Sequence, residues 1–475
     1  MSQSVANQHQ DLAVSPALST YVAGALAADP PHEHRERARL HVLDTLAAIV
    51  ACRDLEPAVL ARAYALGLSR SDGPNAATIL GTSDKASLVD AAFAGAMTGH
   101  AAEINDFIPS AFVQPGPPVL AAALAVAETR GATGGELLRA VMAGYELAGR
   151  MPKALGVGNL RRAGIANHGI GPLFGAATAA AVLLRLPADT VEHVWTYCAQ
   201  QASGSWQWLL DVEHIEKAFV FAGMGARDGL HAALMAQAGF RGVRGALDHP
   251  GGWMRSALFR DGDGDRAYLI ADLGARSELP LTAFKRFPVG GPTQPAVEAL
   301  LSLLSRIDSS QVQAVRIEMP GRWEAFRDAA MPALNLRYLT AIILIDRRLD
   351  FVAAQNLTRM AQDPEVSELM GRVEITHDPN QEAAPGQPRT ESARVIVQLT
   401  DGREETAYTP HVLGFPSHPM GQADVEAKAV DLMAPALGEA RAEAVVAATR
   451  DLENLADSRT LIDLIRPSPY PDITA

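Results

Sequence analysis

The chain has 475 residues, of which 48% are hydrophobic and 20% charged, and its formal net charge is −13. This length exceeds what one hydrophobic core usually fills, so we expect two domains. The acidic balance argues against nucleic acid and anionic membranes as partners, and it leaves a small anionic substrate open if a site gathers cations locally.

The two cysteines and the N-terminal sequence both predict a soluble protein in a reducing compartment. The two cysteines, Cys52 and Cys198, lie in apolar helical contexts, which predicts buried structural thiols rather than a disulfide scaffold or a cysteine metal site. The first ten residues lack the basic and apolar regions of a signal peptide, and runs such as 175–184 are too short to span a membrane. We therefore expect a cytoplasmic protein.

Helical patterns fill the chain from about residue 12 to 275. The run from Leu40 to Ala51 is apolar nearly all round, which predicts a helix inside the core. Pro117 and Pro118 suit the first turn of a helix, and Gly239 suits a helix end. The expected helices cover 86–102, 117–128, 136–148, 174–184, 188–201 and 224–238.

The pattern changes near Leu279. Alternation with period two predicts strands at 312–319, 372–376 and 393–399, and Asp401-Gly402 predicts a hairpin turn into a strand at 404–408. Helices are expected at 294–307, 338–346, 424–433 and 439–451. The segment Asp378–Thr390, rich in Pro, Gln and Gly, predicts a mobile surface loop.

These elements predict a mainly α protein. We expect one large all-helical domain built from both chain ends, residues 1–278 and 412–475. A smaller α+β domain, residues 279–411, is inserted into it.

The chain carries no established nucleotide-binding, hydrolase or metalloprotease motif in a suitable context, so its chemistry must come from scattered residues. The first candidates are Glu103 and Asp106, which end a helix too rich in Ala and Gly to face water. Two carboxylates there are costly unless paired, hydrated or used. They are either a base and its electrostatic partner, or a helix end with Asp106 capping the next turn.

Three further stretches hold polar candidates. His168, in a glycine-broken loop before a helix that starts near Phe174, is an acid–base group or an ordinary loop histidine. Lys217, at the start of an apolar helix, holds a substrate carboxylate or extends to the surface. Lys285 and Arg286, beside a glycine-rich loop at the domain boundary, form a candidate anion clamp.

Tyr338 is the last candidate taken from the residues themselves. A tyrosine in such a helix most often belongs to the core with its hydroxyl satisfied. Only a position in a cleft would make Tyr338 a proton donor.

Several landmarks, in order, resemble the 2-methylcitrate dehydratase superfamily, the MmgE/PrpD group. The resemblance covers nearly the whole chain and rests on the order and spacing of its motifs. The matching segments are His41–Val50, His100–Asp106, Gln114–Val119, Gly175–Ala177, Lys217 with Gly229–Leu234, Lys285–Pro288, Tyr338–Ala341, Asp401-Gly402, and Pro419 followed by Lys428.

The resemblance implies a helical domain with an inserted α+β lid, a cleft between them, no cofactor or metal, and a homodimer. The chain departs from the family pattern at three positions: Glu103 replaces an aspartate, and Gln114 and Gln294 replace histidines. Glutamine can orient a substrate but cannot exchange protons near neutral pH.

These observations predict a cofactor-independent lyase of the 2-methylcitrate dehydratase type, acting on a small polycarboxylate by proton removal next to a carboxylate. Lys217, Lys285 and Arg286 would bind carboxylates, and Gln114 and Gln294 would orient the substrate. His168 or Glu103 would be the base, with Asp106 beside it, and Tyr338 the proton donor. The alternatives are an epimerase or isomerase, a decarboxylase, or a catalytically silent ligand-binding member.

Overall fold

The computed structural model describes residues 13–260, 262–321, 323–384 and 391–467. The first ten residues, on which the expected lack of a signal peptide rests, lie outside these ranges. So do residues 385–390 of the expected loop Asp378–Thr390. Within these ranges the protein is mostly α-helical, as expected, and it has two small sheets.

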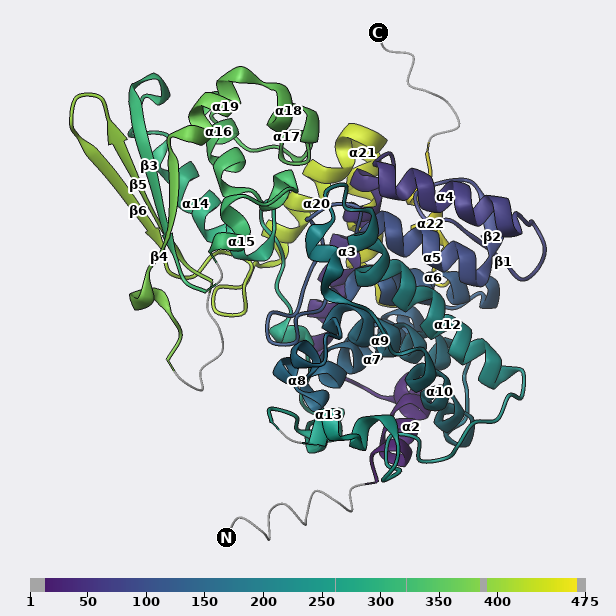
Figure 1. Cartoon of the computed structure of the whole chain (residues 1–475). Helices are drawn as coiled ribbons and strands as arrows, with labels where there is room; N and C mark the ends of the chain where they lie inside the picture. Colours follow the sequence, from purple (N-terminus) through teal and green to yellow (C-terminus); the bar gives the residue numbers. More distant parts are fainter. Residues whose placement is uncertain (1–12, 261, 322, 385–390, 468–475) are drawn as a thin grey trace.

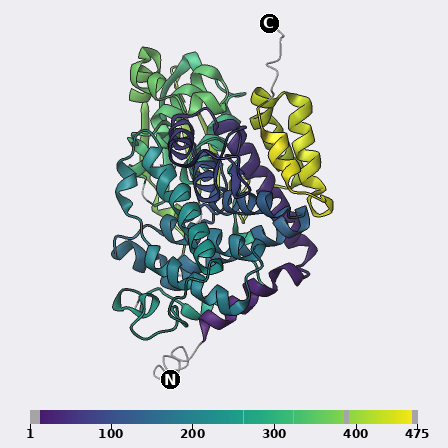
Figure 2. The same ribbon diagram turned by 90° about the vertical axis from the view of Figure 1, so that its right-hand side faces the viewer.

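The helical part contains most of the long helices. Its first stretch contains α2 (Val14–Gly24), α3 (His32–Cys52), α4 (Glu56–Ser69), α5 (Leu88–Gly99), α6 (Gly116–Arg130), α7 (Gly134–Leu155), α8 (Val157–Arg162), α9 (Asn167–Leu183), α10 (Ala188–Gln201), α11 (Ile215–Ala218), α12 (Met224–Gln237) and α13 (Ala257–Arg260). The C-terminal stretch adds α20 (Gln422–Leu437), α21 (Glu439–Arg450) and α22 (Arg459–Ile465). In Figure 2 these last helices stand beside the N-terminal ones, and α20 packs along α3.

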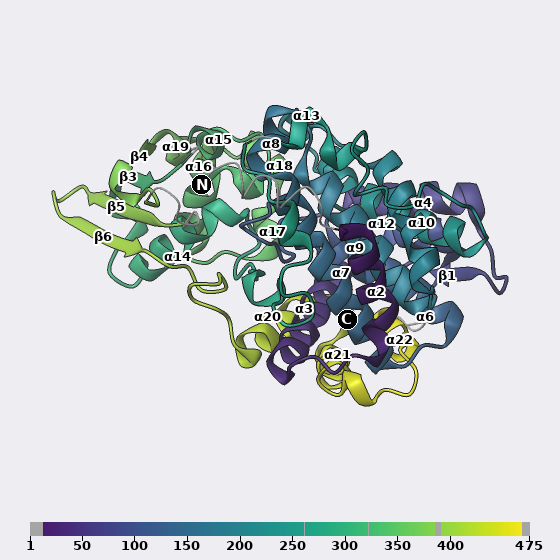
Figure 3. The same cartoon turned by 90° about the horizontal axis from the view of Figure 1, so that it is seen from below.

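A separate part of the chain forms the larger sheet, which lies to the left in Figures 1 and 3. Its strand order is β4-β3-β5-β6, with β3 and β4 parallel and the other pairs antiparallel. The elements are α14 (Gln294–Leu303), β3 (Val312–Met319), α15 (Glu324–Arg327), α16 (Leu336–Asp346), α17 (Phe351–Ala354), α18 (Leu357–Gln362), α19 (Pro364–Gly371), β4 (Val373–His377), β5 (Ala393–Leu399) and β6 (Glu404–Thr409).

Each part buries its own apolar cluster. The larger cluster draws residues from 14–284 and again from 420–465, whereas the one beneath the larger sheet draws only from 289–399. This division agrees with the sequence pattern. The domain limits and the movement of the sheet part as a lid stay predictions.

Small residues let the central helices of the helical part approach closely. A side chain at Gly175 of α9 would place its Cβ 2.8 Å from the backbone oxygen of Gly144 in α7.

Both cysteines are free and buried, as expected, and burial raises the pKa of Cys52 to about 12. Among the described residues, we find no helix whose length and apolar character would let it cross a bilayer.

Two expectations about local structure were wrong. The helical part is not all-helical, because β1 (Ala76–Thr78) and β2 (Lys85–Ser87) pair as an antiparallel hairpin. Three-residue strands contain too few alternations to be recognised from the sequence. In addition, α9 starts at Asn167 rather than near Phe174, so His168 lies in a helix and not in a loop.

Candidate active site

A cavity of about 540 Å³ lies between the helical part and the sheet part. Its helical wall includes Glu103, Gln114, His168 and Lys217, and Lys285 reaches it from the segment that joins the two parts. The opposite wall comes from the sheet part, mainly from residues 290–292 and 324–334. Five of the nine site residues predicted from the sequence therefore line one cavity.

Three charged side chains meet at one side of this cavity. Glu103 follows α5 and is 3% exposed, and its Oε2 accepts a hydrogen bond of 2.8 Å from Lys285 Nζ. Lys217 Nζ donates to the other carboxylate oxygen. Burial would raise the pKa of Glu103, but attraction to Lys217 and Lys285 outweighs it and holds the pKa well below its usual value. Burial also lowers the pKa of Lys217.

The backbone explains how residues so far apart in sequence meet. Phe107 and Ala283 exchange two backbone hydrogen bonds, of 3.1 and 2.7 Å, which hold the chain after Glu103 against the chain before Lys285. Lys217 lies on α11, whose next turn, Phe219–Gly223, is π-helical. Such turns are frequent at functional sites because they displace side chains from a regular helix face.

His168 lies in the first turn of α9 and faces the cavity. Its ring stacks on Phe221 at 3.7 Å between centroids, and Gln114 Oε1 lies 3.0 Å from Nδ1. A neutral ring that donates from Nδ1 to this amide oxygen keeps its lone pair on Nε2. Burial, aided by the charge of Lys217, lowers the pKa of His168 well below its ordinary value, so the ring is neutral near pH 7.

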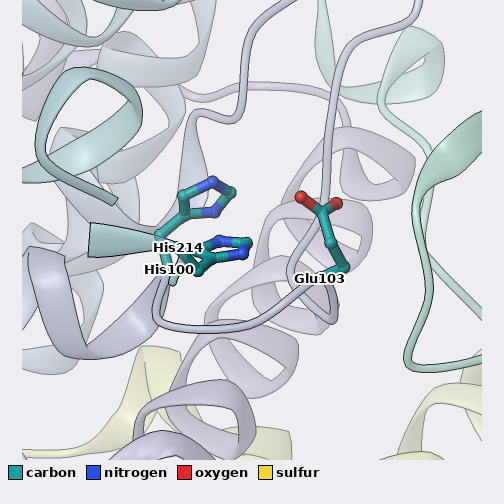
Figure 4. Close-up of side chains that lie close together, drawn as sticks. All are labelled: His100, Glu103 and His214. Carbon is teal, nitrogen blue, oxygen red and sulfur yellow. The ribbon is translucent and has the colours of Figure 1, made fainter. Parts of the chain in front are cut away.

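Two buried histidines beside Glu103 were not among the predicted site residues. His100 ends α5, and His214 precedes α11 in the left-handed backbone region with φ of 65°. Figure 4 shows their rings side by side next to the Glu103 carboxylate. Burial lowers the pKa of His214 to about 3, and His100 Nε2 has no hydrogen-bond partner among the described residues. Only the position of His214 three residues before Lys217 could have drawn attention to it.

His100, Glu103 and His214 are also a potential metal-ligand set, because their ligand atoms lie within 4.8 Å of one another. However, both oxygens of Glu103 accept hydrogen bonds from lysine ammonium groups. A divalent cation would have to displace these positive charges. The arrangement therefore fits an anion better than a cation.

Asp106 lies behind the cavity wall rather than on it. Its carboxylate accepts a 2.6 Å hydrogen bond from Tyr145 and a 3.0 Å bond from the backbone nitrogen of Gly116, and it lies 2.8 Å from His41 Nδ1. Asp106 is completely buried. It therefore anchors the loop that carries Glu103 to α3, α6 and α7 instead of facing a ligand.

Besides Asp106, three predicted site residues lie outside the cavity. The Tyr338 hydroxyl donates to Ala353 O at 2.7 Å within the core of the sheet part, so it is not positioned as a proton donor. Gln294 bonds the backbone of Phe287 and Val289, which holds a turn and not a substrate.

Arg286 is the third, and the reason is geometric. The side chains of Lys285 and Arg286 have different surroundings. Lys285 is 1% exposed, whereas the Arg286 side chain is 44% exposed and lies 3.5 Å from Glu298. The expected two-residue clamp is therefore wrong, and Lys217 takes the place of Arg286 beside Lys285.

Comparisons with known proteins agree with the resemblance seen in the sequence. The chain is similar to cis-aconitate decarboxylase of Aspergillus terreus strain NIH 2624, with 24% identity over 500 aligned positions that cover 98% of each chain. A second cis-aconitate decarboxylase from Aspergillus terreus matches to the same extent. The MmgE/PrpD N-terminal domain matches residues 16–263, and the MmgE/PrpD C-terminal domain matches residues 287–454. The chain therefore belongs to the MmgE/PrpD family.

Proposed function

We propose that this protein is a cofactor-independent lyase of the 2-methylcitrate dehydratase type, which removes a proton next to a carboxylate of a polycarboxylate substrate. The observation that carries the proposal is the meeting of Lys217 and Lys285 on Glu103 in a cavity that His168 also lines. Family membership supports a lyase-like activity.

The buried cations would supply the electrostatic part of the reaction. A carbanion next to a carboxylate is stabilised poorly by resonance alone, so fixed positive charges are needed where the negative charge develops. Lys217 and Lys285 are buried, so each of their interactions is stronger than it would be in solution. A substrate carboxylate would share these ammonium groups with Glu103.

His168 would transfer the proton. Its Nε2 has a free lone pair, and its low pKa keeps the ring neutral and able to accept a proton. The imidazolium formed is a strong acid for the same reason. It can return the proton to a departing hydroxide, so that one residue completes the loss of water. Gln114, which bonds Nδ1, would fix the tautomer that this step needs.

Decarboxylation is the second candidate, and similarity to cis-aconitate decarboxylases favours it. In that reaction carbon dioxide leaves and the carbanion takes up a proton. The tautomer of His168 presents an acceptor rather than a donor at Nε2, so it serves proton removal better. Epimerisation needs proton-transfer groups on two faces, and His168 is the only histidine that lines the cavity among the described residues.

The test is incubation with 2-methylcitrate, citrate, cis-aconitate and iminodisuccinate in deuterated water, followed by NMR. We expect loss of water from a hydroxy acid and solvent deuterium in the recovered substrate. Carbon dioxide release would replace the first proposal with the second. Binding without any exchange or turnover would indicate a silent ligand-binding member.

A matched pair of variants tests the site itself. Lys285→Met removes a buried cation, and we expect a loss of turnover of at least a hundredfold. Arg286→Met removes the neighbouring cation outside the cavity and should retain nearly full activity. Equal losses would contradict the placement of the anion site.

A further inference from the structure

The cavity has an apolar region that the proposed chemistry does not use. Beyond the lysines its walls carry large apolar side chains from both parts of the molecule. These include Phe112, Trp206, Trp208 and Leu210 from the helical part, and Phe326 and Met331 from the sheet part. Ligand pockets of roughly 300–1,000 Å³ hold drug-sized molecules, so a cavity of about 540 Å³ has more room than a compact six-carbon acid fills.

The mouth of the cavity continues this apolar surface. Leu209 and Leu210 belong to one short helical turn, Trp206–Leu210, and are 51% and 83% exposed. Single exposed leucines are common on protein surfaces, but two adjacent ones that line a cavity are a candidate ligand contact. Trp208 is 9% exposed and packs edge-on to Phe221 at 4.7 Å.

Most of the acidic side chains on the cavity lining come from the sheet part. On the described lining, cationic side chains are Arg161, Lys217 and Lys285, against five acidic ones. Three of these acids, Glu324, Asp328 and Glu391, come from the sheet part, whereas Asp211 accepts a 2.8 Å hydrogen bond from the backbone nitrogen of Lys217. A compact molecule with carboxylates on every side would direct some of them toward these acids of the sheet part, whereas carboxylates confined to one end could all face the lysines.

We infer that the substrate is amphipathic: it carries its carboxylates at one end, on Lys217 and Lys285, and an alkyl or aryl substituent that packs against the Trp206–Leu210 turn and Phe326. This inference rests on the proposed function, because it takes the lysines as the carboxylate site. It adds a substrate class, a dicarboxylate with a sizeable apolar group.

The test measures binding, so it does not depend on turnover. Calorimetry with 2-methylsuccinate, 2-butylsuccinate and 2-hexylsuccinate isolates the apolar contribution. Each fully buried methylene strengthens binding by up to about fourfold. We expect 2-hexylsuccinate to bind at least tenfold more tightly than 2-methylsuccinate, and equal or weaker binding overturns the inference.

Two variants locate the effect. Leu210→Ser and Phe326→Ser should each reduce the gain in affinity that the hexyl group provides over the methyl group at least threefold. Neither variant should change the affinity for 2-methylsuccinate itself. Leu68→Ser, which changes a leucine 61% exposed on α4 and outside the cavity, is the control and should change neither. If Leu210→Ser changes the molar mass in light scattering and leaves the gain intact, this surface contacts a second copy and the inference fails.

A further ligand separates this inference from the proposed function. The uncharged diamide of 2-hexylsuccinate should bind at least tenfold more weakly than the diacid. If it binds equally well, the lysines are not a carboxylate site and the proposed function fails too. If 2-methylsuccinate binds as tightly as the hexyl compound and Lys285→Met abolishes both, only the apolar inference fails.

Discussion

Removal of Glu103 should destabilise the protein more than removal of either lysine that it binds. In the native protein one buried carboxylate neutralises part of the charge of two ammonium groups. Lys217→Met leaves the 2.8 Å pair between Glu103 and Lys285 intact. The free energy of unfolding then falls by the value of one charged hydrogen bond, about 1.5–3 kcal/mol. This loss is partly offset, because the variant no longer has to bury the ammonium group of residue 217.

Glu103→Gln leaves two ammonium groups buried without their shared counter-charge. Breaking a buried pair in this way costs about 3–5 kcal/mol. The free energy of unfolding of Glu103→Gln should therefore lie about 2 kcal/mol below that of Lys217→Met. Urea unfolding at pH 7, followed by circular dichroism and tryptophan fluorescence, measures both.

The pH dependence of this difference gives a second, independent check. Burial already lowers the pKa of Lys217 from 10.5, and loss of Glu103 lowers it further. A lysine whose pKa is lower in the folded than in the unfolded protein destabilises the folded state at every pH below its folded pKa. This destabilisation disappears as the pH rises to about 10.5, the pKa of the unfolded state. The deficit of Glu103→Gln relative to wild type should therefore shrink between pH 7 and 9.5.

Two results would refute this reasoning. The first is a Lys217→Met variant as unstable as Glu103→Gln. The second is a Glu103→Gln deficit that does not depend on pH. Either would mean that the two ammonium groups are not buried together with one carboxylate.

Further predictions concern the surroundings of the site. Burial lowers the pKa of His41 from 6.5 to about 4, so the free energy of unfolding should fall by up to about 3 kcal/mol as the pH drops from 6.5 to 4. In urea titrations, His41→Gln should show a smaller fall in the free energy of unfolding over the same pH range. Gly116→Ala would place a Cβ 2.6 Å from Asp106 Oδ1, so we expect a loss of about 1–3 kcal/mol and lower turnover. Tyr338→Phe removes the bond to Ala353 and should cost about 1 kcal/mol with kcat unchanged, whereas a large fall in kcat would restore its role as a proton donor. Chelator treatment should leave activity unchanged, because ammonium groups engage the carboxylate of the histidine–glutamate cluster, and a loss would contradict this.

Secondary structure was predictable where the local pattern is strong. The expected helix 188–201 and the strands 312–319 and 393–399 match α10, β3 and β5 at both ends. The start of α9 was missed because Gly169, Gly171 and Pro172 weaken the helical pattern. Tertiary packing overrides that local preference, since these residues are buried within the helical part.

The site was only partly predictable, because its members are far apart in the sequence. Glu103 lies 114 residues from Lys217 and 182 from Lys285. All three were candidates from the sequence, Glu103 because a buried carboxylate is costly, and the two lysines because they lie beside an apolar helix and a glycine-rich loop. No local pattern could show that one carboxylate serves both lysines. His100 opens the landmark His100–Asp106 but was not counted among the site residues, and His214 was missed because a single histidine carries no signal until its neighbours in space are known.

Glu103 and Asp106 show why a cluster of carboxylates does not have to act as a unit. Glu103 faces the cavity and binds two lysines, whereas Asp106 faces the core and binds the backbone of α6 and the rings of Tyr145 and His41. The lysines that bind Glu103 can accept a substrate carboxylate from the cavity. The partners of Asp106 cannot, because Asp106 is completely buried. Substitutions around Asp106 should therefore alter the position of Glu103 and lower turnover, while leaving the selectivity for the apolar group of a ligand unchanged.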